Sequence, residues 1–252
     1  MYLIGKFQTV KTIFFLLFIP SLLFSQEFDI KGSFQAKTIL SNEDENPFWF
    51  HTNTNYAVGD FTNISSIGEV ITSLTYSSFT ISGGAAFYGR DGVAEAVQRR
   101  DLYLQFETSW LLATAGAKKQ KEVLDGLSAT NQNFLRSGNA RPLPGILLEA
   151  NNPFKISKTF GIDWGIGHYV LNDTRYVDNT QLHYKRLGVI TTFNDRHKLT
   201  LKVQHYAQWG GTSPEWGKLK SGFKDYVNVF FAHNTEEYGI EGETINKLGN
   251  HL

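Results

Sequence analysis

The feature that most constrains this chain is an alternation of apolar and polar residues, with a period of two, that recurs along most of its length. The first run begins at Phe28, where Phe28, Ile30 and Gly32 alternate with polar residues up to about Leu40. Successive side chains of a β-strand point to opposite faces, so each run predicts a strand with two different faces. Further runs follow at about 70–76, 79–88, 101–107, 111–119, 146–150, 162–168, 182–193 and 198–209.

The connections between these runs differ in length. Ser77-Ser78 and the tetrapeptide 194–197 predict tight turns, whereas 41–56 and 120–145 predict long loops. Short turns on one side and long loops on the other are typical of outer-membrane barrels. Between Trp216 and Phe230 the apolar residues instead recur every three and four positions, which predicts a short amphipathic helix in a loop.

Residues 1–25 predict a secretory signal peptide. Basic residues precede the apolar run Thr12–Phe24, which contains Pro20, and Ser25 is a small residue at the expected cleavage point. A transmembrane helix needs roughly 20 apolar residues, so this run is too short to span a bilayer. We therefore expect export through the general secretory pathway, with residues 26–252 forming the N-terminal part of one barrel domain.

Composition excludes several kinds of function. The chain has no cysteine, a net charge of zero and 14% aromatic residues. It therefore offers no thiolate site and no strongly basic surface for nucleic acid. No His-Glu-x-x-His, Gly-x-Ser-x-Gly or phosphate-binding glycine loop is present. We predict a protein that is not an enzyme, with no metal site and no cofactor.

The predicted fold is an all-β, antiparallel transmembrane outer-membrane β-barrel. A mean hydropathy of −0.25 fits this fold, because barrel strands alternate lipid-facing and lumen-facing residues. A water-soluble sandwich also has many short strands, but the export signal, the lack of disulfides and the aromatic content favour the barrel. Residues 245–252 do not complete a closing strand, so we expect a truncated sequence and an incomplete barrel.

Five segments of the chain together carry a resemblance to a known family. They are 46–49 (NPFW), 137–144 (SGNARPLP), 194–198 (NDRHK), 205–211 (HYAQWGG) and 245–251 (INKLGNH). In their order and spacing they resemble the capsule assembly Wzi family in its Bacteroidetes form, and the resemblance covers almost all of the mature chain. It implies a large outer-membrane barrel that retains capsular or exopolysaccharide at the cell surface and acts as a lectin. Members of the family are longer than this chain, and none of their sugar-binding residues is carried over.

The first candidate site is the turn-rich stretch that contains Arg136, Asn139 and Arg141, stiffened by Pro142 and Pro144. Arginine pairs well with the carboxylates of an acidic glycan, and loops on a rigid scaffold often bind ligands. The alternative is a loop that plugs the barrel, with its arginines paired to lumen carboxylates.

The second candidate site lies near the end of the 198–209 run. Tyr206, Gln208 and Trp209 could contact a sugar by stacking and hydrogen bonding, although the position of Trp209 at a strand end favours a membrane-interface aromatic. His183 and Lys185 share one face of a neighbouring strand. If that face is luminal, they contribute positive charge for a glycan; the alternative is an ordinary solvated lumen wall.

These patterns predict a non-catalytic outer-membrane protein that binds surface polysaccharide and supports capsule or exopolysaccharide assembly or attachment. An outer-membrane channel or transporter is the second hypothesis, and an outer-membrane hydrolase is the third. The expected partners are the polysaccharide and outer-membrane lipid, and nucleic acid is not among them. The sequence leaves the oligomeric state open.

Overall fold

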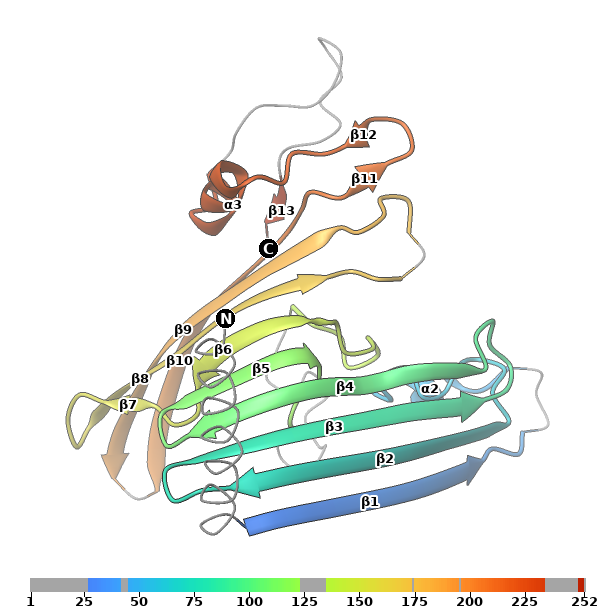
Figure 1. Cartoon of the computed structure of the whole chain (residues 1–252), viewed down its shortest axis with the longest axis horizontal. Helices are drawn as coiled ribbons and strands as arrows, with labels where there is room; N and C mark the ends of the chain where they lie inside the picture. Colours follow the sequence, from blue (N-terminus) through green and yellow to red (C-terminus); the bar gives the residue numbers. More distant parts are fainter. Residues whose placement is uncertain are drawn as a thin grey trace, which may run out of the picture.

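A computed structural model of the chain describes residues 27–41, 45–122, 135–173, 175–194, 196–233 and 249–251. The expected signal peptide lies outside these residues, as does most of the 245–252 segment. The dominant feature is one antiparallel sheet in which neighbours in the chain are neighbours in space (Figure 1). The all-β, antiparallel prediction is therefore confirmed. The long strands are β1 (Glu27–Thr38), β2 (Ile64–Thr75), β3 (Phe79–Arg90), β4 (Val97–Thr108), β5 (Leu111–Ala117), β6 (Gly145–Ala150), β8 (Phe160–Val170), β9 (Gln181–Asn194) and β10 (His197–Trp209).

Each alternating run of the sequence corresponds to one long strand, although β2 begins earlier than its run, at Ile64. The predicted helix is present as α3 (Phe223–Phe230), but it starts later than its spacing implied. The carboxylate of Asp225 accepts a hydrogen bond of 2.9 Å from the Gly222 N–H, which fixes the start of the helix there. The short elements are α2 (Phe48–His51), β7 (Phe154–Lys155), β11 (Thr212–Ser213), β12 (Gly217–Lys218) and β13 (Gly249–His251).

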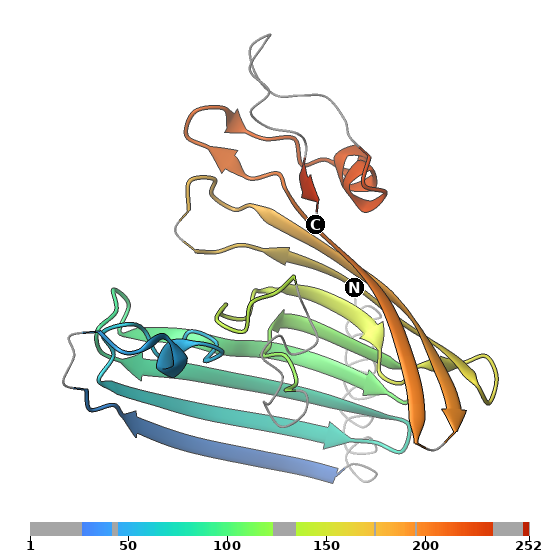
Figure 2. The same ribbon diagram turned by 180° about the vertical axis from the view of Figure 1, so that it is seen from behind.

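The two ends of the sheet differ, as the sequence predicted. At one end, called here the short-turn end, two or three residues join β2 to β3, β4 to β5 and β9 to β10, and residues 151–159, which include β7, join β6 to β8. At the other, the long-loop end, lie the described parts of the remaining connections, which are 39–41, 45–63, 91–96, 118–122, 135–144, 171–173 and 175–180. The sheet curls, so that β8–β10 rise steeply from the plane of β1–β4 and segment 135–144 lies in the hollow (Figures 1 and 2). Within the described residues β1 and β10 are not paired, so the sheet is an open, curved wall.

One face of the wall, called here the apolar face, carries the exposed apolar side chains of the long strands. In β4, Leu102 and Leu104 are 57% and 67% exposed. Tyr103 and Gln105 point to the opposite face, the cleft face, and are buried. The registers place the equivalent residues of other strands on the apolar face, among them Phe28, Ile30, Phe34, Val70, Phe87, Ile146, Leu187, Leu199, Leu201 and Val203.

The boundary of these apolar residues crosses the hydrogen-bonded rows of the sheet obliquely. One row of paired residues runs from Phe28 on β1, through Lys185 on β9, to His205 on β10. On β1 the large apolar residues continue to Phe34, six positions from this row toward the long-loop end. On β10 the exposed large apolar residues end at Val203, two positions short of the row, and Trp209 beyond it is buried against Val229 of α3. The boundary therefore shifts by eight residues between β1 and β10.

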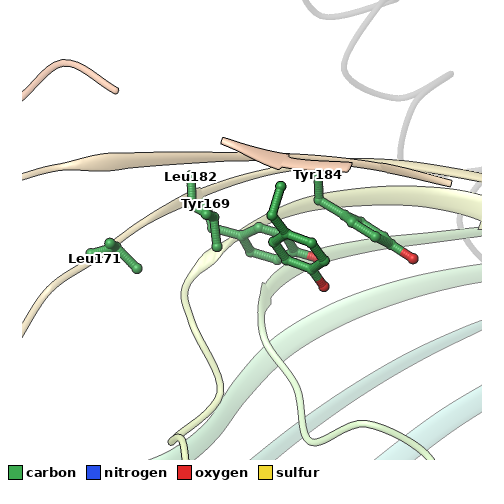
Figure 3. Packing of buried hydrophobic residues seen from close by; sticks show 5 residues of the cluster. Tyr169, Leu171, Leu182 and Tyr184 are labelled. Atoms are coloured by element: carbon green, nitrogen blue, oxygen red, sulfur yellow. The ribbon is translucent and has the colours of Figure 1, made fainter. Parts of the chain in front are cut away.

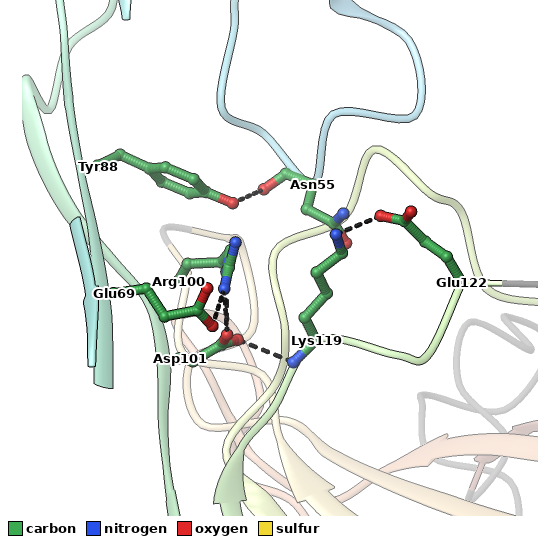
Figure 4. Close-up of polar contacts among 7 residues, drawn as sticks. All are labelled: Asn55, Glu69, Tyr88, Arg100, Asp101, Lys119 and Glu122. Atoms are coloured by element: carbon green, nitrogen blue, oxygen red, sulfur yellow. Dashed lines mark hydrogen bonds and ion pairs between the residues drawn. The ribbon is translucent and has the colours of Figure 1, made fainter. Parts of the chain in front are cut away.

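Ion pairs bind neighbouring strands together on the cleft face. A β-bulge in β4 makes Arg100 an extra residue in the pairing with β3 and turns its side chain onto Asp101 and Glu69 (Figure 4). Nη2 of Arg100 lies 2.7 Å from Glu69 Oε1 and 2.8 Å from Asp101 Oδ2. Asp101 also accepts a 2.8 Å hydrogen bond from the backbone N–H of Lys119.

A second charge network joins β6, β8 and β9. Nη1 of Arg186 lies 2.6 Å from Glu149 Oε2, and Nη2 lies 3.0 Å from Asp163 Oδ1. All three side chains are less than a fifth exposed. Arg186 therefore neutralises two carboxylates that would otherwise lie close together on a partly buried surface.

Candidate functional site

The cleft face is hollowed by a cleft of about 1260 Å³ at the long-loop end. Its walls come from four connections, which contribute Tyr56, Glu95, Arg141 and Arg175, and its floor includes Tyr206. Sites for small molecules usually have volumes of about 300–1,000 Å³. The cleft therefore has room for several rings of an extended ligand.

The floor of the cleft rests on a tyrosine cluster formed by β8, β9 and β10. Tyr169, Tyr184 and Tyr206 are each less than a tenth exposed and pack with Leu171 and Leu182. The rings of Tyr184 and Tyr206 are 4.7 Å apart, and the labelled residues of Figure 3 show how the rings gather on one face. Alternation along the strands directs them all to this face.

Segment 135–144 is clamped onto this cluster. Leu135 and Leu143 pack against the tyrosines. The backbone oxygen of Gly138 accepts a 2.9 Å hydrogen bond from Asn55 N–H, and the Asn139 side-chain oxygen accepts one from Asn53 N–H. The candidate residue Asn139 therefore joins two loops, and its oxygen positions the segment.

The two candidate arginines of this segment both line the cleft. Arg136 lies over the Tyr169 ring, with 5.9 Å from the guanidinium carbon to the ring centre. No ion pair among the described residues involves Arg136 or Arg141, so the arrangement expected of a carboxylate-paired plug loop is not seen there. The charge of Arg141 acts on Arg90 and on Arg99, while the carboxylates of Glu95, Asp173 and Asp178 line the same cleft.

An ion pair occupies the opposite wall, in the loop between β8 and β9. Nε and Nη2 of Arg175 each donate a 2.6 Å hydrogen bond to the carboxylate of Asp173. This hydrogen bonding holds the pKa of the Asp173 carboxyl below its ordinary value, so the carboxylate is charged at neutral pH. The positive charge of Arg175 is thus largely neutralised, whereas that of Arg141 is not.

Tyr56 is a cleft residue that the sequence did not reveal. Asn53, Asn55 and Tyr56 all have positive φ angles, of 56°, 52° and 69°. Tyr88 O–H donates a 2.8 Å hydrogen bond to Asn55 O, and Arg90 donates to Tyr56 O while lying 4.5 Å from the Tyr56 ring centre. A bulky residue is rarely found at such a φ angle, so these long-range contacts hold the ring at the cleft. The asparagines, which tolerate positive φ, were the available signal, and they predict only a turn.

The remaining candidates divide between the two faces. Tyr206 and Gln208 line the cleft, as expected for a binding site. His183, Lys185 and Trp209 lie on the apolar face, because each is paired in a row of apolar-face residues. His183 and Trp209 are 0% and 5% exposed. His183 and Lys185 therefore lie on the face of the sheet opposite the cleft and do not join the other candidates there.

Comparisons with protein-family models, curated proteins and solved structures found no match to this chain. Among the residues that the structure describes, no group of three or more His, Cys, Asp or Glu side chains is placed to hold a metal ion. No helix in the same part of the chain is long and apolar enough to cross a membrane.

Proposed function

We propose that this chain forms part of the wall of an outer-membrane β-barrel and binds a surface polysaccharide in the cleft at its long-loop end. In this role it is not an enzyme. It holds capsule or exopolysaccharide at the cell surface and so supports its assembly or attachment. The observation that carries the proposal is the oblique boundary of the apolar face.

The size of the shift along the boundary gives the tilt of the strands in a flat lipid layer. Eight residues at about 3.4 Å each correspond to about 27 Å along the strands. The eight strand-to-strand steps from β1 to β10, at about 4.8 Å each, correspond to about 38 Å across them. The ratio of these two lengths corresponds to a strand tilt of about 35° from the membrane normal. Strands of outer-membrane barrels tilt by about 35–45°.

A water-soluble sandwich provides no reason for such a boundary. Its apolar residues face a dry interior and are buried, whereas here Leu201 and Val203 are 64% and 74% exposed. A bilayer explains both the exposure and the tilt. In such a barrel the short turns face the periplasm and the long loops face the outside, so the cleft opens toward the surface polysaccharide.

The chemistry of the cleft supports an acidic glycan as the ligand. Arg136 and Arg141 provide fixed positive charge that no carboxylate of the described residues pairs. Guanidinium groups bind carboxylates through paired hydrogen bonds. The Tyr56 ring, 47% exposed, offers an apolar surface for the C–H face of a sugar. The resemblance to the capsule assembly Wzi family supports the same role.

The test is a deletion of the gene in the producing bacterium, followed by complementation. Carbohydrate is measured on the cells and in the medium. We expect the deletion to move polysaccharide into the medium with total synthesis unchanged, and wild-type protein to reverse this. A double variant, Arg136→Ser with Arg141→Ser, should fail to complement although it reaches the outer membrane.

The control is Arg196→Ser, which makes the same kind of substitution once, at the short-turn end and far from the cleft. It should complement like the wild type. If the deletion strain keeps its cell-bound polysaccharide, or if the double variant restores it fully, the proposed function is wrong.

A further inference from the structure

Helix α3 packs against the apolar face, at the place where that face becomes polar. Beyond the boundary at Val203, the outward side chains of β8–β10 include His168, His183, His205 and Lys185. On the short-turn side of the same boundary they are apolar, as with Leu201. The outward side chains therefore change from apolar to polar within about one row of the sheet.

The helix covers these polar residues closely. Val229 is 0% exposed and packs against Ala207 and Trp209. The rings of Tyr226 and Phe230 each lie 5.4 Å from the His183 ring. Lys185 Nζ donates a hydrogen bond to the backbone oxygen of Phe230, one of the carbonyls left over at the end of a helix. Helix α3 thus contacts the polar residues of the strands through two aromatic rings and one backbone oxygen.

The apolar arc of α3 is wider than this contact requires. At about 100° per residue, Phe223, Val227 and Phe231 fall between the docked side and the polar side that carries Lys224 and Asp225. Phe223 is 82% exposed and Phe231 is 60% exposed. The two phenylalanines therefore form an exposed apolar edge on a helix that is already docked.

We propose that α3 is an interfacial helix that lies among the lipid headgroups of the outer leaflet and inserts Phe223 and Phe231 at the edge of the acyl chains. The inference rests on the proposed membrane wall, and it identifies the level on the protein at which the acyl chains end. Amphipathic helices lie in the plane of this interface with their apolar side about 5–10 Å deep. Helix α3 lies just beyond Val203, where the exposed apolar residues of β10 end. In the proposed membrane wall this is the level of the lipid headgroups.

The experiment uses the absence of cysteine from the chain. Single cysteines replace Phe223, Phe231, Lys224 or Leu201 in the complete protein, and each is labelled with an environment-sensitive fluorophore. The protein is reconstituted in phosphatidylcholine vesicles that carry a nitroxide either near the headgroup or near the end of the acyl chain. Quenching by each lipid then reports the depth of each position.

We expect the label at Phe223 or Phe231 to be quenched more strongly by the shallow nitroxide, by at least about twofold over the deep one. The label at Leu201 should respond to the deep nitroxide, and the label at Lys224 should respond to neither. If Leu201 is quenched but both phenylalanine positions behave like Lys224, the interfacial helix is refuted and the membrane wall stands. If Leu201 is not quenched, the membrane wall fails, and the interfacial helix fails with it.

Discussion

Arginine substitutions along β10 should reveal a depth scale on the apolar face. With a strand tilt of about 35°, each residue advances about 2.8 Å along the membrane normal. Measured from the boundary between Val203 and His205, Leu199 then lies about 14 Å deep, Leu201 about 8 Å and Val203 about 3 Å. The apolar band of an outer-membrane barrel is about 25 Å tall, so Leu199 lies close to its middle.

The expected costs follow from these depths. Arginine at the bilayer midplane destabilises a barrel by about 2–4 kcal/mol, and near the interface by about 0–1 kcal/mol. We therefore expect Leu199→Arg to lower the free energy of unfolding by about 2–4 kcal/mol, Val203→Arg by less than about 1 kcal/mol, and Leu201→Arg by an intermediate amount. Thr200→Arg is the matched control, because Thr200 is exposed on the cleft face.

The assay is denaturant unfolding of each variant folded in phosphatidylcholine vesicles, followed by tryptophan fluorescence, with unfolding and refolding curves required to coincide. Exposed surface substitutions in water usually change stability by less than about 0.5 kcal/mol. A value in that range for Leu199→Arg, or an equal cost for Thr200→Arg, would refute the membrane assignment of the apolar face. Equal costs along the strand would refute the tilt.

Three further substitutions test the cleft and the wall. Asp173→Asn should tighten binding of the bacterium's purified surface polysaccharide about fivefold, because a charge about 4 Å away in water contributes about 1 kcal/mol; calorimetry that shows unchanged or weaker binding would contradict an acidic ligand. Arg186→Met should lower the free energy of unfolding by up to about 3–5 kcal/mol, since Glu149 loses its partner and Asp163 is left with Lys202, whose Nζ lies 3.9 Å away, and an unchanged unfolding midpoint would show the network to be weak. Gly138→Ala places a Cβ too close to Asn53 Oδ1 and 3.4 Å from Asn53 Cα, so the Asn53 side chain must move and the contact between the two loops is disturbed; polysaccharide binding should weaken with an unchanged midpoint, and wild-type affinity would argue against this clamp.

The strands could be predicted from the sequence because the signal for each is local. An alternating run such as 79–88 is complete within β3 and needs no distant partner. The helical spacing before Phe230 was equally local, and only its start was misplaced. Gly222 and Asp225, which set that start, form a weaker signal than the apolar spacing.

The sequence predicts only in part which residues lie on the apolar face and which lie on the cleft face. Counting back in steps of two from Val189 and Leu187 places Lys185 and His183 on the apolar face, so the signal was present in the sequence. The polar side chains of both residues obscure this signal, because they resemble those of lumen residues. Tyr56 is different, because Arg90 and Tyr88 fix its position from distant strands, and no local pattern records such contacts.

The oblique course of the apolar boundary limits how the lengths of these strands can change during evolution. Inserting a single residue into β5 would turn every later residue of that strand to the opposite side of the wall. Inserting two residues would keep each side chain on its own face of the sheet but would displace the later part of the hairpin by one row. A charged residue would then enter the lipid, or an apolar residue would enter water. Insertions and deletions should therefore accumulate in the long connections, such as 118–144, while the strands keep their lengths.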